Sequence, residues 1–346
     1  MTATTSTLPE GAPAGNWFRL DQNRAIVFGG AGFIGSHLLE RLASENPGAE
    51  LYSVDISKPR FRVAGVHYIP HDVTEPIPSQ LCGSGSALIF NLAAVHTTPG
   101  HEDWEYYHTN VLGACNICRY AAEIGAPRIV FTSSISVYGP SETPRDEDSA
   151  LEPVSAYGRS KAMAEAIHEM WQSERAGERQ LTVVRPAVIY GLTERGNFTR
   201  LAQLLAKGRF VYPGRKDTIK SCGYVKDLVS SMLFMAQKTD RVAVYNFCYP
   251  ERYTSEDICA AFCDVAGYRV PSLVIPIRIM LLGGLAFEIL GKLGLKTKVN
   301  RARVMKLFHS TNIVPKRLQE AGFRYTYGLP ASLSDWRGAS QTREFV

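Results

Sequence analysis

The stretch RAIVFGGAGFIG, residues 24–35, decides the fold, because it joins an apolar run to closely spaced glycines at the start of a helical pattern. We expect a buried strand over Arg24–Gly29 and a helix over Phe33–Ser44. Between them, one glycine permits a tight turn, another lets a pyrophosphate approach the backbone, and a third lets the helix pack on the strand. Free N–H groups at the helix N-terminus would face the phosphates. The predicted dinucleotide loop contains Gly29, Gly32, Phe33, Ile34 and Gly35.

A carboxylate at the end of the next expected strand, Leu51–Asp55, indicates which dinucleotide would bind. Asp55 follows Gly32 by 23 residues. A carboxylate there can bind both hydroxyls of the adenosine ribose and would repel a 2′-phosphate, which favours NAD over NADP. Lys58 and Arg60 nearby keep NADP open, and a plain strand-end cap is the other interpretation of Asp55.

The rest of the first half also alternates short apolar runs with helical segments. Strand–helix repetition of this kind predicts an α/β fold with a doubly wound parallel sheet, the Rossmann architecture. The further strands are expected at Val66–Pro70, Ala87–Asn91, Arg128–Ser133 and Leu181–Arg185, and the further helices near Trp104–Ile124 and Ala156–Arg175.

The pattern becomes mixed after Tyr190, which predicts a smaller C-terminal substrate domain. We expect the dinucleotide-binding domain at 21–190, with 220–248 returning to it, and the substrate domain at 191–219 and 249–336. Residues 1–20 and 337–346 are expected to be tails, the first of them disordered.

Two further strand ends carry candidate cofactor contacts. Asp72 and Val73 follow the third strand, and Leu92 and Ala93 follow Asn91 at the end of the fourth. Carboxyl ends of parallel strands line the ligand crevice in this architecture. These four residues are therefore predicted to line the adenine and phosphate channel, although each pair alone could be an ordinary turn.

Tyr157 and Lys161 lie four residues apart on an expected helix, so their side chains share one face. A close ammonium lowers the pKa of a phenol, and a phenolate could then act as a base near neutral pH. Tyr212 and Lys216 repeat the spacing, but the Pro-Gly between them predicts a turn, so this pair is not expected to be catalytic. A hydroxyl-rich strand end at residues 132–136 could bind a substrate oxygen.

These motifs together resemble the extended short-chain dehydrogenase/reductases, and most closely their sugar-nucleotide epimerase/dehydratase branch. The residues that carry the resemblance are GGAGFIG, Asp55, SSISVYG (133–139), YGRSK (157–161) and RPAVIYG (185–191), within a likeness that runs from about residue 24 to 336. It implies NAD as cofactor and Ser134, Tyr157 and Lys161 as the catalytic trio. It also implies that Asn110 lies behind the nicotinamide and Pro186 beside it.

One departure from that branch bears on the reaction. The 4,6-dehydratases carry Thr-Asp-Glu where this chain has Ser134, Ile135 and Ser136. Without that acid and base, elimination of water is not expected, and hydride chemistry with a tyrosine base remains.

Basic residues gather in two parts of the second half, although the whole chain carries only +5. Residues 200–226 contain seven Lys or Arg and one acid, and residues 292–306 contain six and none. A diphosphate requires such a field, unless these are merely solvated surface charges. By the resemblance, the contacts to a nucleotide-sugar diphosphate would be Asn197, Lys220 and either Arg301 or Arg303.

Composition excludes several other classes of protein. The 346 residues are 45% hydrophobic and 21% charged, which is typical of a folded chain. A net charge of +5 argues only weakly for nucleic acid, and seven cysteines are too few for a disulfide scaffold and fit a reducing, cytoplasmic setting. His96, His101 and His108 lack carboxylate or Cys partners, so no metal is expected.

The most apolar segment, residues 275–295, is too short to span a membrane. Its longest uncharged run is Ile279–Phe287, against the roughly 20 residues that a bilayer needs. It could contact a membrane surface with help from the basic residues that follow. A core helix or a hydrophobic cleft wall is the preferred interpretation.

The leading functional hypothesis is an NAD-dependent sugar-nucleotide epimerase that transiently oxidises the sugar at C4, expected to be a homodimer. A 4-keto-sugar-nucleotide reductase or dehydrogenase needs the same trio and is the main alternative. A 3β-hydroxysteroid-type dehydrogenase is favoured by residues 275–295 and disfavoured by the two basic clusters. The intact Tyr157–Lys161 pair argues against a non-catalytic NAD-sensing regulator.

Overall fold

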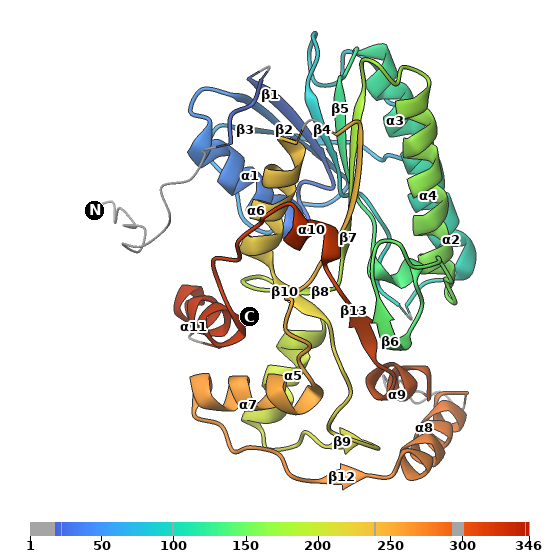
Figure 1. Cartoon of the computed structure of the whole chain (residues 1–346), viewed down its shortest axis with the longest axis vertical. Helices are drawn as coiled ribbons and strands as arrows, with labels where there is room; N and C mark the ends of the chain where they lie inside the picture. The colour runs from blue at the N-terminus through green and yellow to red at the C-terminus, as the bar shows by residue number, and fades with distance from the viewer. Residues whose placement is uncertain are drawn as a thin grey trace.

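The main sheet has seven strands, all parallel, which confirms the doubly wound parallel architecture predicted from the sequence (Figure 1). The computed structural model describes residues 18–21, 23–98, 100–238, 240–292, 301–342 and 344–345. The strand order β11-β7-β5-β4-β1-β2-β3 reverses direction between β1 and β4, where ligands bind in doubly wound sheets. The strands are β1 (Arg24–Phe28), β2 (Glu50–Asp55), β3 (Val66–Pro70), β4 (Leu88–Asn91), β5 (Arg128–Thr132), β7 (Gln180–Pro186) and β11 (Val242–Phe247).

Helices cover both faces of this sheet, which is why its central strands, such as β1, β4 and β5, are largely apolar and buried. Side chains alternate along β1: Ala25 and Val27 join one core, whereas Ile26 and Phe28 join the other. The first core lies under α1 (Phe33–Glu45) and α6 (Val225–Ala236), and the second under α3 (Gly113–Glu123) and α4 (Ala156–Ser173).

The segment predicted as one helix over Trp104–Ile124 is divided into three. It consists of α2 (Asp103–Tyr107), a π-helical turn η1 (His108–Leu112) and α3. Such turns inside helices are frequent at functional sites, and this one contains Asn110.

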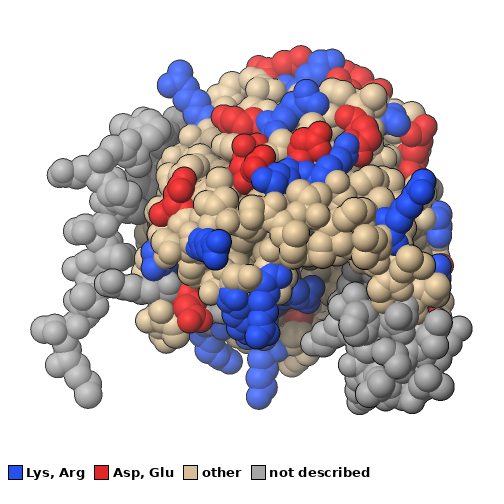
Figure 2. Space-filling view, turned by 90° about the horizontal axis from the view of Figure 1, so that it is seen from below, with Lys and Arg blue, Asp and Glu red and all other residues tan. Residues whose placement is uncertain are grey.

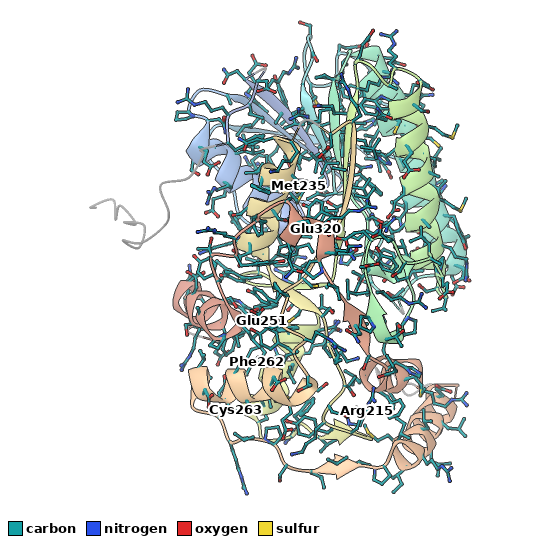
Figure 3. The ribbon with its side chains drawn as sticks, in the orientation of Figure 1. Arg215, Met235, Glu251, Phe262, Cys263 and Glu320 are labelled. Atoms are coloured by element: carbon teal, nitrogen blue, oxygen red, sulfur yellow. The ribbon has the colours of Figure 1, made fainter. Side chains whose placement is uncertain are left out.

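The second half returns to the first domain before it forms its own core. Strand β11 pairs with β7, and α6 packs against α1. The smaller part, at the bottom of Figure 1, has a separate aromatic core that includes Tyr190, Phe198, Phe262 and Trp336. Phe262 and its neighbour Cys263 lie on α7 (Ser255–Ala266), as Figure 3 shows. Its other elements are α5 (Asn197–Ala206), β8 (Val188–Tyr190), β9 (Tyr212–Pro213), β10 (Cys222–Tyr224), β12 (Val274–Ile275) and α11 (Leu329–Ala339).

Both chain ends contain packed residues that the expected tails included. Phe18 and Leu20 are buried in the core beneath α1, Arg19 between them is exposed, and residues 1–17 of the expected first tail lie outside the described residues. At the other end, α11 continues to Ala339, and Phe345 is buried against Phe262 and Trp336. The domains therefore extend beyond the boundaries that composition indicates.

The apolar segment after residue 275 forms a helix at the edge of the molecule. Helix α8 (Ile277–Lys292) pairs with α9 (Arg301–Phe308) at the lower right of Figure 1. Ile279 and Leu282 are 59% and 67% exposed, so the preferred interpretation of a core helix was wrong for this face. Within the described ranges, no helix combines the length and apolar character needed to cross a bilayer.

Candidate active site

The glycine loop after β1 has the shape that a bound pyrophosphate requires. Gly29 has φ +79°, and a Cβ there would lie 2.7 Å from the backbone N of Ala93. A Cβ on Gly35 would lie 2.4 Å from the Gly29 carbonyl oxygen, so this glycine lets α1 pack on the loop. Helix α1 follows Gly32, has no side-chain cap and carries no acid in its first turn. Its N-terminal N–H groups therefore suit an anion, and the loop fits a dinucleotide such as NAD.

Asp55 lies against this loop at the end of β2. Its carboxylate accepts hydrogen bonds from the Ala31 N–H at 3.1 Å and the Ser57 N–H at 2.8 Å. The Arg60 N–H donates to the Ala31 carbonyl at 3.3 Å, so the chain that carries Arg60 also borders the loop. Burial lowers the pKa of Arg60, and its Nη1 is buried without a hydrogen-bond partner in the described part of the chain.

The residues after β3 and β4 contribute mainly backbone groups to the candidate cofactor site. Asp72 is exposed, and its carboxylate accepts hydrogen bonds from the Thr74 N–H and hydroxyl. Val73 is buried, and its carbonyl accepts a hydrogen bond from the Asn116 side chain at 2.8 Å. The Leu92 N–H donates to Phe28, which holds Leu92 and its neighbour over the glycine loop. Sequence reasoning missed Asn116, a polar residue on the buried face of α3.

Asn110 positions two segments rather than facing open space. Its Oδ1 accepts from the Val95 N–H at 2.9 Å, and its Nδ2 donates to the Val95 carbonyl and to the Ser160 hydroxyl. It thus ties the loop after β4 to α4. Asn110 is buried in the π-helical turn, and its role behind the cofactor stays a prediction.

Ser134 and Tyr157 come together beyond the end of β5. Ser134 begins the short 3-10 helix Ile135–Val137 and accepts a hydrogen bond from the Ser136 N–H. Tyr157 is in the first turn of α4, and its hydroxyl is hydrogen-bonded to Ser134. Burial raises the pKa of Tyr157 to about 12, while the bond with Ser134 acts in the opposite direction.

Lys161 is one turn further along α4 and is buried. Its Nζ donates to the Thr132 carbonyl at 2.8 Å and lies 4.8 Å from the centre of the Phe131 ring. Burial lowers the pKa of Lys161 to about 7, opposed by the Glu165 carboxylate. The expectation that a nearby ammonium lowers the pKa of Tyr157 was therefore wrong for this structure. Burial favours the neutral form of each side chain, and this effect prevails.

A buried polar network supports the trio from behind, and sequence reasoning missed most of it. Arg185 forms two hydrogen bonds with the Glu165 carboxylate and a third with the Tyr138 hydroxyl. His168 donates from Nδ1 to the Ala164 carbonyl, so its Nε2 can accept from Asn91 at 3.1 Å. Burial lowers the pKa of His168 to about 4, which keeps it neutral. Glu165 and His168, polar residues on the buried face of α4, were the features of the sequence that could have indicated this network.

Pro186 ends β7 and is buried beside Phe247 of β11. It lies at a carboxyl strand end, and its place near the nicotinamide stays a prediction.

The two basic clusters meet at one place. Lys220 donates from Nζ to the backbone carbonyls of Lys306 and His309 at the C-terminus of α9. Arg215, labelled in Figure 3, donates to the Ser310 hydroxyl at 3.0 Å. Burial lowers the pKa of Lys220 to about 8. Residues far apart in sequence thus converge, although Lys220 already holds α9 in place.

The other expected diphosphate contacts are less well placed. Asn197 is exposed at the first residue of α5. Arg301 pairs with Glu288 of α8, its Nε lying 3.0 Å from the carboxylate, so it faces α8. Arg303 is in α9, but its side chain lies outside the described residues.

The second Tyr–Lys pair belongs to the other core. Tyr212 is buried in β9, and Gly214 has φ +77°, so a turn separates it from Lys216. The Lys216 ammonium pairs with Glu256 at 2.9 Å. The two side chains share no helix face, as predicted.

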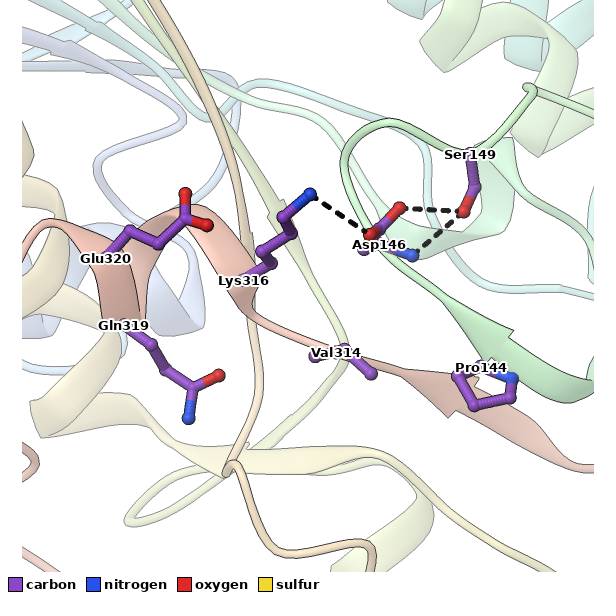
Figure 4. A pocket seen from close by; sticks show the side chains of 7 residues that line it. All are labelled: Pro144, Asp146, Ser149, Val314, Lys316, Gln319 and Glu320. Atoms are coloured by element: carbon purple, nitrogen blue, oxygen red, sulfur yellow. Dashed lines mark hydrogen bonds and ion pairs between the residues drawn. The ribbon is translucent and has the colours of Figure 1, made fainter.

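A surface depression lies away from the trio. Figure 4 shows the ion pair between Lys316 and Asp146, and the bonds from Asp146 to Ser149. These charges already have partners, so we assign the depression no catalytic role. It is lined by Pro144, Asp146, Ser149, Val314, Lys316, Gln319 and Glu320. Among the described residues, no group of three or more His, Cys, Asp or Glu could hold a metal ion.

Comparisons with known proteins agree with this geometry. The chain is 30% identical over 321 residues to N-acetyl-alpha-D-glucosaminyl-diphospho-ditrans,octacis-undecaprenol 4-epimerase of Escherichia coli O157:H7, covering 90% of this chain and 93% of that protein. It is 28% identical over 269 residues to UDP-glucuronic acid decarboxylase 1 of Arabidopsis thaliana, covering 70% and 58%.

Solved structures share the fold. MoeE5 in complex with UDP-glucuronic acid and NAD superposes with a TM-score of 0.72 at 23% identity, covering 90% of this chain and 98% of that chain. The model of the NAD dependent epimerase/dehydratase family matches residues 25–248. With its glycine loop and its Ser134–Tyr157–Lys161 arrangement, this chain belongs to the NAD dependent epimerase/dehydratase family.

Proposed function

We propose that the protein is an NAD-dependent 4-epimerase of a sugar carried on a diphosphate. The observation that carries the proposal is the convergence of Ser134, Tyr157 and Lys161 at the carboxyl end of β5. Carboxyl strand ends are where ligands bind in doubly wound sheets, and the glycine loop after β1 lies at the same edge. The similarity to a sugar-diphosphate 4-epimerase over nearly all of both chains supports this choice.

Tyr157 moves the proton of the reacting hydroxyl. Tyr157 would act as a phenolate: its oxygen accepts the proton as the sugar alcohol becomes a ketone, and the resulting phenol returns that proton when the alcohol forms again. Ser134, hydrogen-bonded to that phenol, holds the sugar oxygen and relays the proton. Bound NAD supplies hydride acceptance and return, and the positive charge of its oxidised form favours a phenolate nearby.

Lys161 orients the Tyr157 phenolate, on which this proton transfer depends. One N–H donor is held by the Thr132 carbonyl, which leaves the others for a cofactor ribose hydroxyl and the phenolate. Gly29, Gly35 and the N-terminus of α1 would hold the pyrophosphate, and Asp55 the adenosine ribose. Ile135 at the position of the dehydratase acid leaves epimerisation or reduction as the chemistry.

The convergence of Lys220 and Arg215 supports a diphosphate in the substrate, although Arg215 also pairs with Glu142 and Asp217. Nucleotide and polyprenyl carriers both present this group, and a sterol does not. A one-way reductase uses the same trio, so product stereochemistry decides between the two reactions.

We also infer a cytoplasmic homodimer. Met163 and Met170 on α4, with Trp104 and Leu112 on the neighbouring helical segment, are large exposed apolar side chains that a second copy would cover. All seven cysteines are free thiols, which supports a reducing compartment.

The test is incubation of the purified holoprotein with UDP-N-acetylglucosamine and with its polyprenyl-diphosphate counterpart. We expect a mixture of C4 epimers and no net absorbance change at 340 nm. Net formation or consumption of NADH, with a single oxidised or reduced product, would instead establish a dehydrogenase or reductase.

A further inference from the structure

The lower edge of the molecule carries a concentrated exposed apolar surface. Six of the sixteen large hydrophobic side chains exposed among the described residues lie between residues 270 and 285. We call this the apolar edge. It consists of Val270, Leu273, Val274, Ile279, Leu282 and Leu285.

The secondary structure presents these side chains on one side. Ile279, Leu282 and Leu285 recur every three residues on α8, so they share a helix face. The other three lie on the extended segment through β12 that leads into α8. In Figure 1 this segment and α8 form the bottom of the molecule. The exposed face of α8 does not pack into the smaller core, because α5, α7 and α11 already pack around that core.

The charged residues within the stretch that forms the apolar edge are basic, and the next acid, Glu288 of α8, pairs with Arg301. No Asp or Glu occurs between Asp264 and Glu288, whereas Arg269 and Arg278 lie in this stretch and are exposed. Figure 2, the view from below, shows more blue Lys and Arg side chains than red acidic ones in its lower half, whereas both colours are mixed toward its top. Exposed apolar side chains flanked by arginines are complementary to a bilayer surface with anionic headgroups.

The edge is also connected to the predicted diphosphate contacts. Helix α8 packs on α9, and Lys220 binds the carbonyls at the C-terminus of α9. Helix α9 has eight residues and thus spans about 12 Å. A lipid diphosphate at the membrane surface would therefore lie close to the basic convergence.

We propose that the apolar edge docks on an anionic membrane surface, and that the substrate is a sugar joined by a diphosphate to a membrane polyprenol. This rests on the proposed function, since it names the carrier of that same substrate. Ile279, Leu282 and Leu285 enter the interface between headgroups and acyl chains, and Arg278 and Arg269 bind lipid phosphates. The sugar diphosphate can then reach the active site while its polyprenyl tail stays in the bilayer.

The test measures co-sedimentation of the NAD-loaded protein with vesicles. One set contains phosphatidylglycerol and phosphatidylethanolamine, and the other contains phosphatidylcholine alone. We expect salt-sensitive binding to the anionic set, reduced at least about tenfold by Ile279→Ser with Leu282→Ser. Arg278→Gln should weaken binding to the anionic set only. The matched control replaces Leu151 and Val242, which are 40% and 41% exposed elsewhere, with serine and should bind as wild type does.

Activity separates this inference from the proposed function. The Ile279→Ser, Leu282→Ser variant should keep its rate on a soluble UDP-sugar within a factor of two. Its kcat/KM on a vesicle-embedded polyprenyl-diphosphate sugar should fall at least tenfold. Full activity on soluble sugars without vesicle binding overturns the membrane inference alone, and a change in oligomeric mass in this variant would assign the edge to a second copy instead. Vesicle binding with no epimerisation on either carrier overturns the proposed function and leaves the docking surface.

Discussion

Lys161 and Thr132 are joined by a hydrogen bond in which the lysine Nζ donates to the backbone carbonyl at 2.8 Å. The bond links the first turns of α4 to the last residue of β5. Ser134, two residues beyond Thr132, is thereby placed beside Tyr157. One strand end and one helix thus determine the geometry of all three candidate catalytic side chains.

The buried amine of Lys161 makes the stability of the cofactor-free protein depend on pH. Its pKa is lowered to about 7 in the folded chain, against about 10.4 when solvated. Between these values the unfolded chain binds a proton that the folded chain lacks, so this contribution to stability rises as pH rises.

Replacing that amine should remove this pH dependence. The difference in free energy of unfolding, wild type minus Lys161→Met, should increase between pH 7 and pH 9 by on the order of 1 kcal/mol per pH unit. Urea denaturation without NAD measures it. The difference between proteins isolates Lys161 from buried thiols and phenols, which titrate in both. If the free energies of unfolding of wild type and Lys161→Met change in parallel with pH, the amine stays charged in the folded state.

Tyr157→Phe should lose activity by about 10²-fold or more, because phenylalanine lacks the oxygen that accepts the proton. Affinity for NAD, measured by fluorescence titration, should change little. Tyr212→Phe is the matched control, since that phenol is buried in the separate lower core. Near-normal turnover of the Tyr157 variant would rule out its assignment as the base.

Asp55→Asn tests the preference for NAD. The asparagine keeps an acceptor oxygen for the Ala31 or Ser57 N–H and removes the charge that repels a 2′-phosphate. The ratio of the Kd for NAD to that for NADP should rise about tenfold, whereas Asp72→Asn, at an exposed carboxylate, should leave it unchanged. If wild type instead prefers NADP, the half-buried Arg60 guanidinium binds the 2′-phosphate and the charge argument for Asp55 fails.

The fold was largely predictable because both of its signals are local. Apolar runs separated by helical patterns identify buried parallel strands. The glycine loop identifies the first strand and the first helix of the dinucleotide-binding fold. The π-helical turn at Asn110 could not be predicted, since it follows from the contacts of that side chain with Val95 and Ser160. The exposed face of α8 was also missed, because composition does not show which side of an apolar helix has a partner.

The candidate site divides in the same way. The spacing of Tyr157 and Lys161 identifies the pair, but their pKa values depend on burial, which sequence does not report. The direction expected for Tyr157 was therefore wrong. The partner of Lys220 was likewise inaccessible, because the carbonyls that it binds lie 86 and 89 residues away.

Lys220 should serve both the substrate and α9. A charge-assisted contact to a diphosphate contributes about 1.5–3 kcal/mol, so Lys220→Ala should raise KM for a diphosphate sugar roughly ten- to a hundred-fold. Affinity for NAD should stay unchanged, because the glycine loop is in the other domain. Hydrogen exchange of the α9 amides should also accelerate, since the carbonyls at its C-terminus lose their donor.

A second substitution separates these two roles of Lys220. Arg301→Ala removes a surface ion pair between α9 and α8 and should leave KM within a factor of two, because that side chain faces Glu288. If it loosens α9 as much as Lys220→Ala does while KM stays normal, the effect of Lys220 on KM comes from the diphosphate. If Lys220→Ala accelerates hydrogen exchange in α9 and leaves KM unchanged, the only role of the lysine is to hold α9 in place. The basic convergence would then lose its link to the substrate, and an uncharged substrate would become the better assignment.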